Sequence, residues 1–310
     1  MTSVAFLFPG QGAQYAGMGR ELATLPAFAA ALEDCASTWS LEVPLRELLF
    51  TTGEDATARL RETRYLQPAL FCIEYALARE VLARGVTPEL LIGHSIGEFV
   101  CAVLADSCSL ADGLALVSER GRLMQALPAG AMLTIRAPAA DILPRLHGEL
   151  GLAAENSPTT CVAAGPKPAI IALKSELAKA RIAAKELHTS HAFHSSMMAP
   201  AVEPLRLRAA QVEWREPRLP VVSTVTGERV LRFTADYFAE QLRAPVRFAQ
   251  AVATAWSDST ITLLEVGPRN TLSTLARAQA KDGQRAIATL ADAPHNELAT
   301  LQAALVELQK

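Results

Sequence analysis

Ser95 stands in the middle of a Gly-x-Ser-x-Gly pattern, a spacing that can present a serine as a nucleophile. An apolar run, Leu90 to Ile92, precedes the pattern, and a helical pattern from Phe99 to Leu104 follows it. This order predicts a sharp strand-to-helix turn, in which Gly93 and Gly97 occupy places where a Cβ would collide with the opposite limb. The serine oxygen would lie at a helix N-terminus, which favours developing negative charge. The alternative is an ordinary glycine-rich turn whose serine caps a helix.

A histidine-rich segment could supply the base without which a serine hydroxyl is inert. Its histidines, His188, His191 and His194, are three residues apart, and this spacing also suggests a metal site. No carboxylate or cysteine cluster accompanies them, so a general base for Ser95 is the favoured hypothesis and no metal is expected. A set of surface or helix-capping polar groups is the remaining alternative.

Arg120 is a candidate for binding an anion. In the helix predicted from Leu110 to Gln125, it has the apolar Leu116 and Val117 as neighbours, whereas Arg122 has polar ones. Arg120 therefore borders the buried face, where a guanidinium is costly unless it meets an anion. That anion could belong to a ligand or to an internal carboxylate, and the side chain could also extend to solvent.

The opening loop, Pro9 to Gln14, follows a buried strand predicted at Val4 to Phe8. Its Pro-Gly-x-Gly composition allows the backbone to approach another group closely, although a plain turn into the next helix would have the same composition. The loop has neither the lysine of a phosphate-binding loop nor a Gly-x-Gly-x-x-Gly pattern, which argues against a nucleotide site.

Composition limits the class of protein. The chain has 310 residues, 50% of them hydrophobic, and a formal net charge of -3, which suits one large domain or a large domain with an insert. No lysine-arginine run predicts nucleic-acid binding, and no apolar run is long enough to span a membrane. The five cysteines are scattered without a Cys-x-x-Cys pair, and no signal peptide is evident, so we expect a reduced, cytoplasmic protein.

Strand and helix patterns alternate in both outer parts of the chain, which predicts an α/β fold with a parallel sheet covered by helices. The middle part has the order β-α-β-β-α-β of a ferredoxin-like unit. We therefore expect a large α/β-hydrolase-like domain formed by residues 1–128 and 189–310, and a small ferredoxin-like subdomain at 129–188. The expected strands are 4–8, 131–136, 152–155, 161–164, 183–187, 219–224, 261–265 and 286–290, with a further strand before Ser95. The expected helices are 19–36, 67–84 with Pro68 in the first turn, 110–125, 139–150, 168–181, 197–210, 235–242, 246–256, 269–280 and 297–308, and the stretch before residue 65 reads as irregular.

Seven motifs in register resemble one family, the malonyl-CoA:acyl-carrier-protein transacylases together with the acyltransferase domains of modular polyketide synthases. They extend over nearly the whole chain. The motifs are Phe8-Pro9-Gly10-Gln11-Gly12-Ala13-Gln14, Gln67-Pro68-Ala69-Leu70, Gly93-His94-Ser95-Ile96-Gly97-Glu98, Arg120-Gly121-Arg122-Leu123-Met124-Gln125, Asn156-Ser157-Pro158, His191-Ala192-Phe193-His194 and Glu265-Val266-Gly267-Pro268.

The resemblance implies a role for each candidate. Ser95 would be the nucleophile that carries the acyl ester and His194 its base. The main-chain carbonyl of Gln241 would orient that histidine, and Arg120 would hold the free carboxylate of a malonyl group. The backbone N–H groups of Gln11 and Ile96 would form the oxyanion hole.

The same resemblance implies an activity. A malonyl group would pass from malonyl-CoA to the phosphopantetheine thiol of an acyl carrier protein, through a malonyl-serine ester and with ping-pong kinetics. His191 and Phe193 belong to a quartet that is similar to the malonyl-type signature, whereas methylmalonyl enzymes have Tyr-Ala-Ser-His there. Phe193 would fill the space that an α-methyl branch needs. The sequence Glu62-Thr63-Arg64-Tyr65 and Ile96 also resemble the malonyl type.

The residues of the motifs resemble those of polyketide enzymes more closely than those of fatty-acid enzymes. We expect a monomer that needs no bound cofactor. The first strand begins close to Met1 and no synthase sequence flanks the motifs, which suggests a free-standing enzyme serving a polyketide assembly line; an excised domain is the alternative. Two other functions are weighed against this one. An acyl hydrolase that clears carrier proteins would have little need of Arg120, and a docking module without activity would not need Ser95, His194 and Gln11 together.

Overall fold

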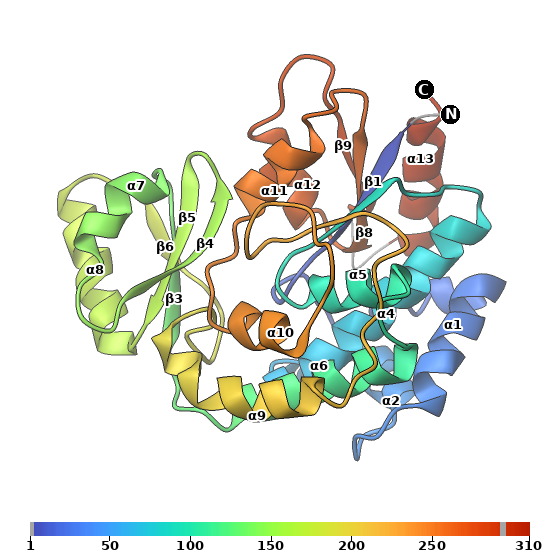
Figure 1. The fold of residues 1–310 in the computed structure, drawn as a ribbon, viewed down its shortest axis with the longest axis horizontal. Coiled ribbons are helices and arrows are strands. Elements are labelled where there is room, and N and C mark those ends of the chain that lie inside the picture. Colours follow the sequence, from blue (N-terminus) through green and yellow to red (C-terminus); the bar gives the residue numbers. More distant parts are fainter. Residues whose placement is uncertain (1–2, 292–295) are drawn as a thin grey trace.

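A five-stranded parallel sheet forms the centre of the protein (Figure 1), in the strand order β7-β2-β1-β8-β9. The computed structural model describes residues 3–291 and 296–310. The strands are mostly apolar and buried because helices cover both faces of a parallel sheet. The strands are β1 (Val4–Phe8), β2 (Leu90–Gly93), β7 (Val221–Val222), β8 (Thr262–Pro268) and β9 (Ala286–Leu290).

The chain connections run in opposite directions on the two sides of β1. On one side the chain passes from β1 to β2 through α4, and on the other side it passes from β8 to β9 through α12. Right-handed crossovers in opposite directions place these two helices on opposite faces, as Figure 1 shows. The helices are α1 (Pro26–Ser37), α2 (Leu45–Phe50), α3 (Glu54–Arg59), α4 (Thr63–Ala83), α5 (Gly97–Leu104), α6 (Leu110–Gln125), α9 (Ala199–Ala209), α10 (Ala235–Gln241), α11 (Phe248–Ala255), α12 (Thr271–Arg277) and α13 (Glu297–Leu308), with 3-10 turns η1 (Leu22–Thr24) and η3 (Ser196–Met198).

A second, antiparallel sheet has the strand order β4-β5-β3-β6. This is the order of a ferredoxin-like unit, as the sequence predicts. Its elements are β3 (Ala131–Ile135), α7 (Ala139–Ile142), η2 (Leu143–Arg145), β4 (Gly151–Ser157), β5 (Thr160–Gly165), α8 (Lys167–Lys179) and β6 (Ala184–Glu186). We call these elements the small subdomain. They all lie inside the segment 129–188 predicted for it, whose bounds remain a prediction.

The small subdomain has two apolar faces. One is covered by its own helices and has a separate core that includes Leu133, Ile142 and Leu173. The other face, through residues such as Ala154 and Val162, belongs to the core of the large body. The small subdomain is therefore packed onto the large body rather than tethered to it.

Several boundaries differ from the sequence prediction. The stretch expected to be irregular contains α2 and α3, and α4 begins at Thr63, so that Pro68 lies inside the helix instead of in its first turn. The helix predicted at 139–150 ends at Ile142 and continues only as the turn η2, because Pro144 and Gly148 interrupt it.

The helix predicted at 246–256 also starts later, at Phe248. Val246 is extended and pairs with β4 instead: its N–H donates to Ala153 O at 2.9 Å, and Glu155 N–H donates to Val246 O at 2.8 Å. This pairing joins the segment after α10 to the small subdomain. The strand predicted at 219–224 is reduced to β7, and β8 extends beyond the predicted 261–265.

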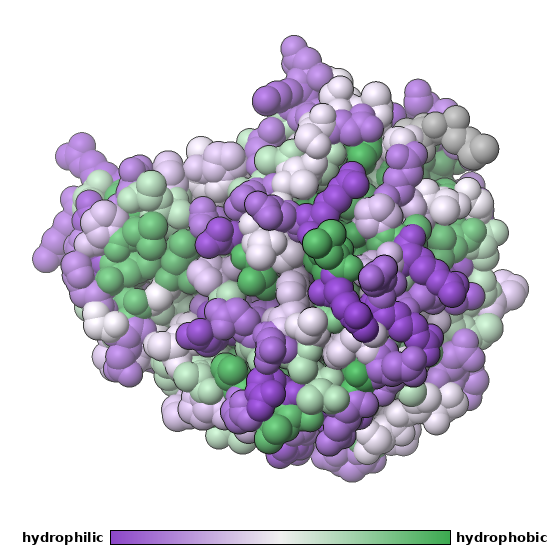
Figure 2. Space-filling view, viewed as in Figure 1, coloured by the Kyte–Doolittle hydropathy of each residue, from purple (hydrophilic) through white to green (hydrophobic). Residues whose placement is uncertain are grey.

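On the face shown in Figure 2, apolar residues gather over the small subdomain, and polar residues are spread over much of the remainder. In residues 3–291 and 296–310, no helix has the length and apolar character needed to cross a membrane. All five cysteines are buried and free.

Candidate active site

Ser95 lies in a strained turn between β2 and α5. Its φ is +55°, in the left-handed region that non-glycine residues seldom adopt. A Cβ on Gly93 would lie 2.1 Å from Glu98 N, and one on Gly97 would lie 2.3 Å from Phe8 O. Both glycines are therefore required by close approach of the backbone, as the sequence predicts for a nucleophile turn.

His194 is the histidine that reaches Ser95. Ser95 Oγ and His194 Nε2 are 2.7 Å apart, although the two residues are separated by 99 positions in the chain. His194 also has a left-handed φ of +55°, and the next residue holds the turn, because Ser195 Oγ donates to Ala192 O at 2.6 Å. A second strained residue at the same site is a mark of function rather than of chance.

Two carbonyl groups act on the His194 ring. His194 Nδ1 is 2.9 Å from the carbonyl oxygen of Ala244, which the sequence did not predict, and the backbone carbonyl of Gln241, the predicted group, also raises the pKa of His194. The orienting role of Gln241 remains a prediction. Gln241 is the last residue of α10, whereas Ala244 lies in the turn that follows it, just before Val246 pairs with β4. The carbonyl that lies 2.9 Å from Nδ1 therefore comes from beyond the helix. Because a carbonyl only accepts, Nδ1 bears the hydrogen and Nε2 is free to accept the serine proton.

Gln241 belongs to the site in another way. Its side-chain Nε2 donates to the carbonyl oxygen of Ser95 at 2.6 Å, and the side chain is buried. The amide therefore fixes the backbone of the nucleophile. This contact was not expected from the sequence.

Burial keeps His194 neutral. Desolvation, and after it the positive charge of Arg120 and the neighbouring His94, lower its pKa to about 3, against the carbonyls of Ala244 and Gln241, which raise it. At neutral pH the imidazole is therefore a proton acceptor.

Arg120 meets the nucleophile from α6. It is fully buried, its Nη2 donates to Ser95 Oγ at 3.2 Å, and its Nη1 donates to Gln67 Oε1 at 2.6 Å. Its Nε has no hydrogen-bond partner among the residues that the structure describes. Desolvation lowers the Arg120 pKa to about 9, and Glu98 opposes this shift, so the side chain is a cation at neutral pH.

The packing of α6 on α4 explains how Arg120 reaches this depth. A Cβ on the next residue, Gly121, would lie 2.8 Å from Thr63 O, so only glycine permits the two helices to come this close. Arg122, two residues further on, is exposed and pairs with Glu119 at 2.7 Å, as the sequence predicts.

Gln67 links two candidate groups and was missed as a functional residue. Its Oε1 accepts from Arg120, and its Nε2 donates to Gln11 Oε1 at 3.1 Å and to Thr63 Oγ1 at 2.8 Å. The signal in the sequence was a single amide before Pro68, between the apolar residues Leu66 and Ala69. Such a group is buried only when it is hydrogen bonded.

The opening loop lies against the nucleophile turn. A Cβ on Gly10 would be 3.0 Å from His94 O and 3.5 Å from the Cβ of Ser95. The N–H groups of Gln11 and Ile96 donate to no group in the described parts of the chain, so both are available to a ligand. Their role as an oxyanion hole remains a prediction.

The small subdomain also reaches the site. Asn156 Oδ1 lies 2.9 Å from His94 Nε2, beside the nucleophile, and desolvation lowers the pKa of His94. Asn156 is thus the contact by which β4 touches the turn. His191 and Phe193 are both buried, with ring centroids 5.9 Å apart, and His191 Nε2 lies 3.1 Å from Leu127 O. Their role in specificity remains a prediction.

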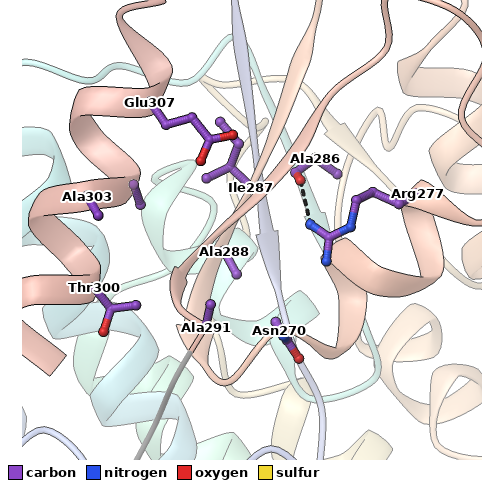
Figure 3. Close-up of a pocket in the computed structure, with 10 residues that line it drawn as sticks. Asn270, Arg277, Ala286, Ile287, Ala288, Ala291, Thr300, Ala303 and Glu307 are labelled. Atoms are coloured by element: carbon purple, nitrogen blue, oxygen red, sulfur yellow. Dashed lines mark hydrogen bonds between the residues drawn. The ribbon is translucent and has the colours of Figure 1, made fainter. Parts of the chain in front are cut away.

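A hollow lies away from these groups, between α12, β9 and α13 (Figure 3), with a volume of about 190 Å³. Its cation, Arg277, already donates to Ala286 O at 2.8 Å. None of the residues that line this hollow belongs to the Ser95 site. Among the described residues, no group of three or more histidine, cysteine, aspartate or glutamate side chains could hold a metal ion.

The structure is thus an α/β fold in which a buried serine in a strained turn is hydrogen bonded to a histidine that a backbone carbonyl orients. Comparison with known proteins shows its family: residues 5–306 match the acyl transferase domain, and the chain belongs to this family. It is 42% identical over 277 residues to the phenolphthiocerol synthesis polyketide synthase type I Pks15/1 of Mycobacterium marinum, and 39% identical over 286 residues to the spectinabilin polyketide synthase system protein NorB of Streptomyces orinoci. These matches cover 87% and 89% of the chain but only 13% of each synthase.

Solved structures give the same result. The acyltransferase domain from the second module of the salinomycin polyketide synthase superposes with a TM-score of 0.93 at 38% identity, covering 100% of this chain and 73% of the other. The malonyl CoA-acyl carrier protein transacylase of Clostridium perfringens superposes with a TM-score of 0.88 at 26% identity, covering 99% of this chain and 97% of the other. The protein is therefore an acyltransferase of the type found in polyketide synthases and in malonyl transacylases.

Proposed function

We propose that this acyltransferase moves a malonyl group from malonyl-CoA to the phosphopantetheine thiol of an acyl carrier protein, by way of an ester on Ser95. The contact of Arg120 with Ser95 Oγ at 3.2 Å carries the proposal. A malonyl group has a free carboxylate close to its thioester, and a planar guanidinium can hold that carboxylate with two hydrogen bonds. The name of the Clostridium perfringens relative, a malonyl CoA-acyl carrier protein transacylase, supports the same substrate.

The first half of the reaction loads the serine. His194 Nε2 takes the proton of Ser95 Oγ as the oxygen attacks the thioester carbonyl, and Nδ1–H stays bonded to the Ala244 carbonyl. The oxyanion would be held by the N–H groups of Gln11 and Ile96, at about 3 kcal/mol for each donor. The C–S bond then breaks, and His194 returns its proton to the leaving CoA thiolate.

The second half is the same chemistry in reverse. The phosphopantetheine thiol gives its proton to His194 and attacks the ester carbonyl, and Ser95 Oγ leaves and is protonated by the histidine. The substrate carboxylate strengthens the base in both halves. Arg120 lowers the pKa of His194, so a bound anion that offsets the charge of Arg120 raises that pKa.

Specificity for malonyl over methylmalonyl is a second part of the proposal. Phe193 is buried and stacks on His191, which would leave little room for an α-methyl branch. One methyl group is worth about 1–3 kcal/mol of discrimination, so a preference of tenfold or more is expected.

Intact-mass measurement after incubation with malonyl-CoA tests the proposal. We expect an adduct of one malonyl group, absent in Ser95→Ala and lost on addition of a holo carrier protein that gains the same group. Methylmalonyl-CoA and acetyl-CoA are run in parallel. Loss of the adduct to water at the same rate with and without carrier protein would identify a hydrolase, and absence of the adduct would overturn the proposal.

A further inference from the structure

A buried carboxyl group, Glu98, lies one turn beyond the nucleophile on α5 and has no part in the reaction described above. It is fully buried, and its carboxylate makes no ion pair within residues 3–291 and 296–310. The Arg120 cation is likewise buried without an ion pair in the same part of the chain. A site with two opposite, unpaired and buried charges is balanced only if each compensates the other.

Glu98 is held by donors from two other elements. Thr224 N–H donates to its Oε1 at 2.6 Å, and Tyr237 OH donates to its Oε2 at 2.9 Å. Tyr237 comes from α10, the helix that also carries Gln241, and Thr224 follows β7. These two hydrogen bonds fix the position of the carboxyl group.

The hydrogen-bond network accepts Glu98 with or without a proton. The Thr224 hydroxyl lies 2.8 Å from Glu98 Oε1 and 2.9 Å from Gly93 O, and it has one proton for the two contacts. If Glu98 is ionised, the Thr224 hydroxyl can donate its proton to only one of these two oxygens. If Glu98 is protonated, it donates to Thr224 Oγ1, and the threonine donates to Gly93 O, so that both contacts are satisfied.

Arg120 is the charged group near Glu98, because its guanidinium carbon lies 5.9 Å from the ring centroid of Phe99, the residue after Glu98 on α5. Tyr237 and Cys101 both interact with Glu98, but burial raises the pKa of each well above its usual value, so both are neutral at pH 7. The Glu98 charge raises the pKa of Arg120. Burial raises the pKa of Glu98 itself to about 7, against the hydrogen bonds from Thr224, Tyr237 and Gln241, which lower it.

We propose that Glu98 is the internal counter-charge of Arg120, and that it takes up a proton from solvent when a malonyl carboxylate binds to that guanidinium. The inference rests on the proposed function. In the free enzyme, an ionised Glu98 compensates the buried cation. The substrate carboxylate brings a second negative charge to the same cation, and protonation of Glu98 removes the repulsion. Glu98 is thus a specificity-determining residue that acts through Arg120 and does not touch the reacting atoms.

The direction of the pH effect follows. Glu98 is neutral below pH 7 and charged above it, so the affinity for the malonyl carboxylate is greatest at low pH and falls as the pH rises through 7. Acetyl-CoA has the same CoA moiety but no carboxylate, and its affinity does not follow this change.

Calorimetric binding to the Ser95→Ala variant, which binds without acylation, measures the proton directly. Titrations at pH 7 in two buffers of different ionisation heat are expected to show uptake of a fraction of a proton with malonyl-CoA and none with acetyl-CoA. Glu98→Gln in the same background preserves the size of the side chain and is expected to abolish the uptake. Equal uptake in both variants, or none in either, overturns the inference.

A second measurement does not depend on the folding of the double variant. The malonyl-CoA affinity of Ser95→Ala, divided by its acetyl-CoA affinity, is expected to fall by about threefold or more between pH 6 and pH 8. A constant ratio contradicts the inference. Intact mass of the unmodified enzyme separates the two proposals: a malonyl adduct without proton uptake defeats only the role of Glu98, whereas absence of the adduct defeats both.

Discussion

Arg120 Nη2 lies 3.2 Å from Ser95 Oγ, and the arginine comes from α6 whereas Ser95 lies in the turn before α5. The guanidinium is fully buried, so solvent does not screen its charge. Any acyl group on Ser95 must therefore occupy the space next to a cation. A neutral acyl chain leaves that cation with only the internal counter-charge proposed for Glu98, whereas a group that ends in a carboxylate pairs with it directly.

Replacement of Arg120 by alanine should lower kcat/KM for malonyl loading by at least about a hundredfold, close to 3 kcal/mol, because a buried charge pair with the substrate is lost. Acetyl loading should fall much less, so the ratio of acetyl to malonyl rises. Stopped-flow measurement of CoA release from both thioesters gives the two values. Arg122→Ala is the matched control, because it removes an exposed arginine from the same helix and should change neither rate. Unchanged malonyl loading in Arg120→Ala would refute the role of this residue.

Gln67 should be tested by two substitutions of different charge. Gln67→Glu places a carboxylate 2.6 Å from Arg120 Nη1, where it would pair with the guanidinium and compete with the malonyl carboxylate. We expect malonyl loading to fall by about tenfold or more, and acetyl loading to be affected less. Gln67→Leu removes the hydrogen bonds to both Arg120 and Gln11 and should slow both substrates similarly. Loading rates from malonyl-CoA and acetyl-CoA, measured in both variants, check these expectations. The same ratio of malonyl to acetyl loading in Gln67→Glu and Gln67→Leu would contradict them.

The pH profile of Ser95 loading should extend to unusually low pH. The His194 pKa is lowered to about 3 by burial first and by Arg120 and His94 after it, so the base is neutral at pH 5, where an ordinary histidine is protonated. Activity is lost only as the pH falls through the pKa of the folded state. We therefore expect kcat/KM for loading from acetyl-CoA, whose binding does not depend on the charge of Glu98, to stay within about twofold between pH 8 and pH 5. Tryptophan fluorescence at each pH confirms that the protein is folded. An acid limb with a midpoint near 6.5 would show that His194 is not buried in this way.

Most of the fold could be predicted because hydrophobic periodicity marks long elements well. The helices 110–125 and 297–308 and the strands Val4–Phe8 and Ala286–Leu290 occur as predicted. The errors fall where local signals are weak or tertiary contacts prevail. The helices α2 and α3 have six residues each, too few to show a clear period, and Val246 is extended because it pairs with Ala154 of the small subdomain.

The candidate site, like the fold, could be predicted only in part from the sequence. Ser95 and Arg120 could be identified because each is an unusual residue in its local pattern, whereas His194 was distinguished from His188 and His191 only by the family resemblance. The structure brings Ser95, His194 and Arg120 together. The Ala244 carbonyl could not be identified, because every residue has a carbonyl and its direction depends on how the segment after α10 joins β4. Gln67 and Glu98 stood within motifs that drew attention to the family, but their partners come from distant elements and no local spacing reveals them.

Gly97 tests whether the nucleophile turn is set by backbone packing. In Gly97→Ala the new Cβ would lie 2.3 Å from Phe8 O, in the strand that forms the centre of the sheet, so β1 or α5 must shift. We expect the free energy of unfolding, measured with urea, to fall by about 3 kcal/mol or more, and malonyl loading to be lost because the turn that holds Ser95 moves. Gly151→Ala is the matched control, since its Cβ would have no contact closer than 3.9 Å, and it should change stability by less than about 1 kcal/mol. A Gly97→Ala variant as stable and active as the unmodified protein would mean that the turn can relax, and that the strain at Ser95 is not enforced by the sheet.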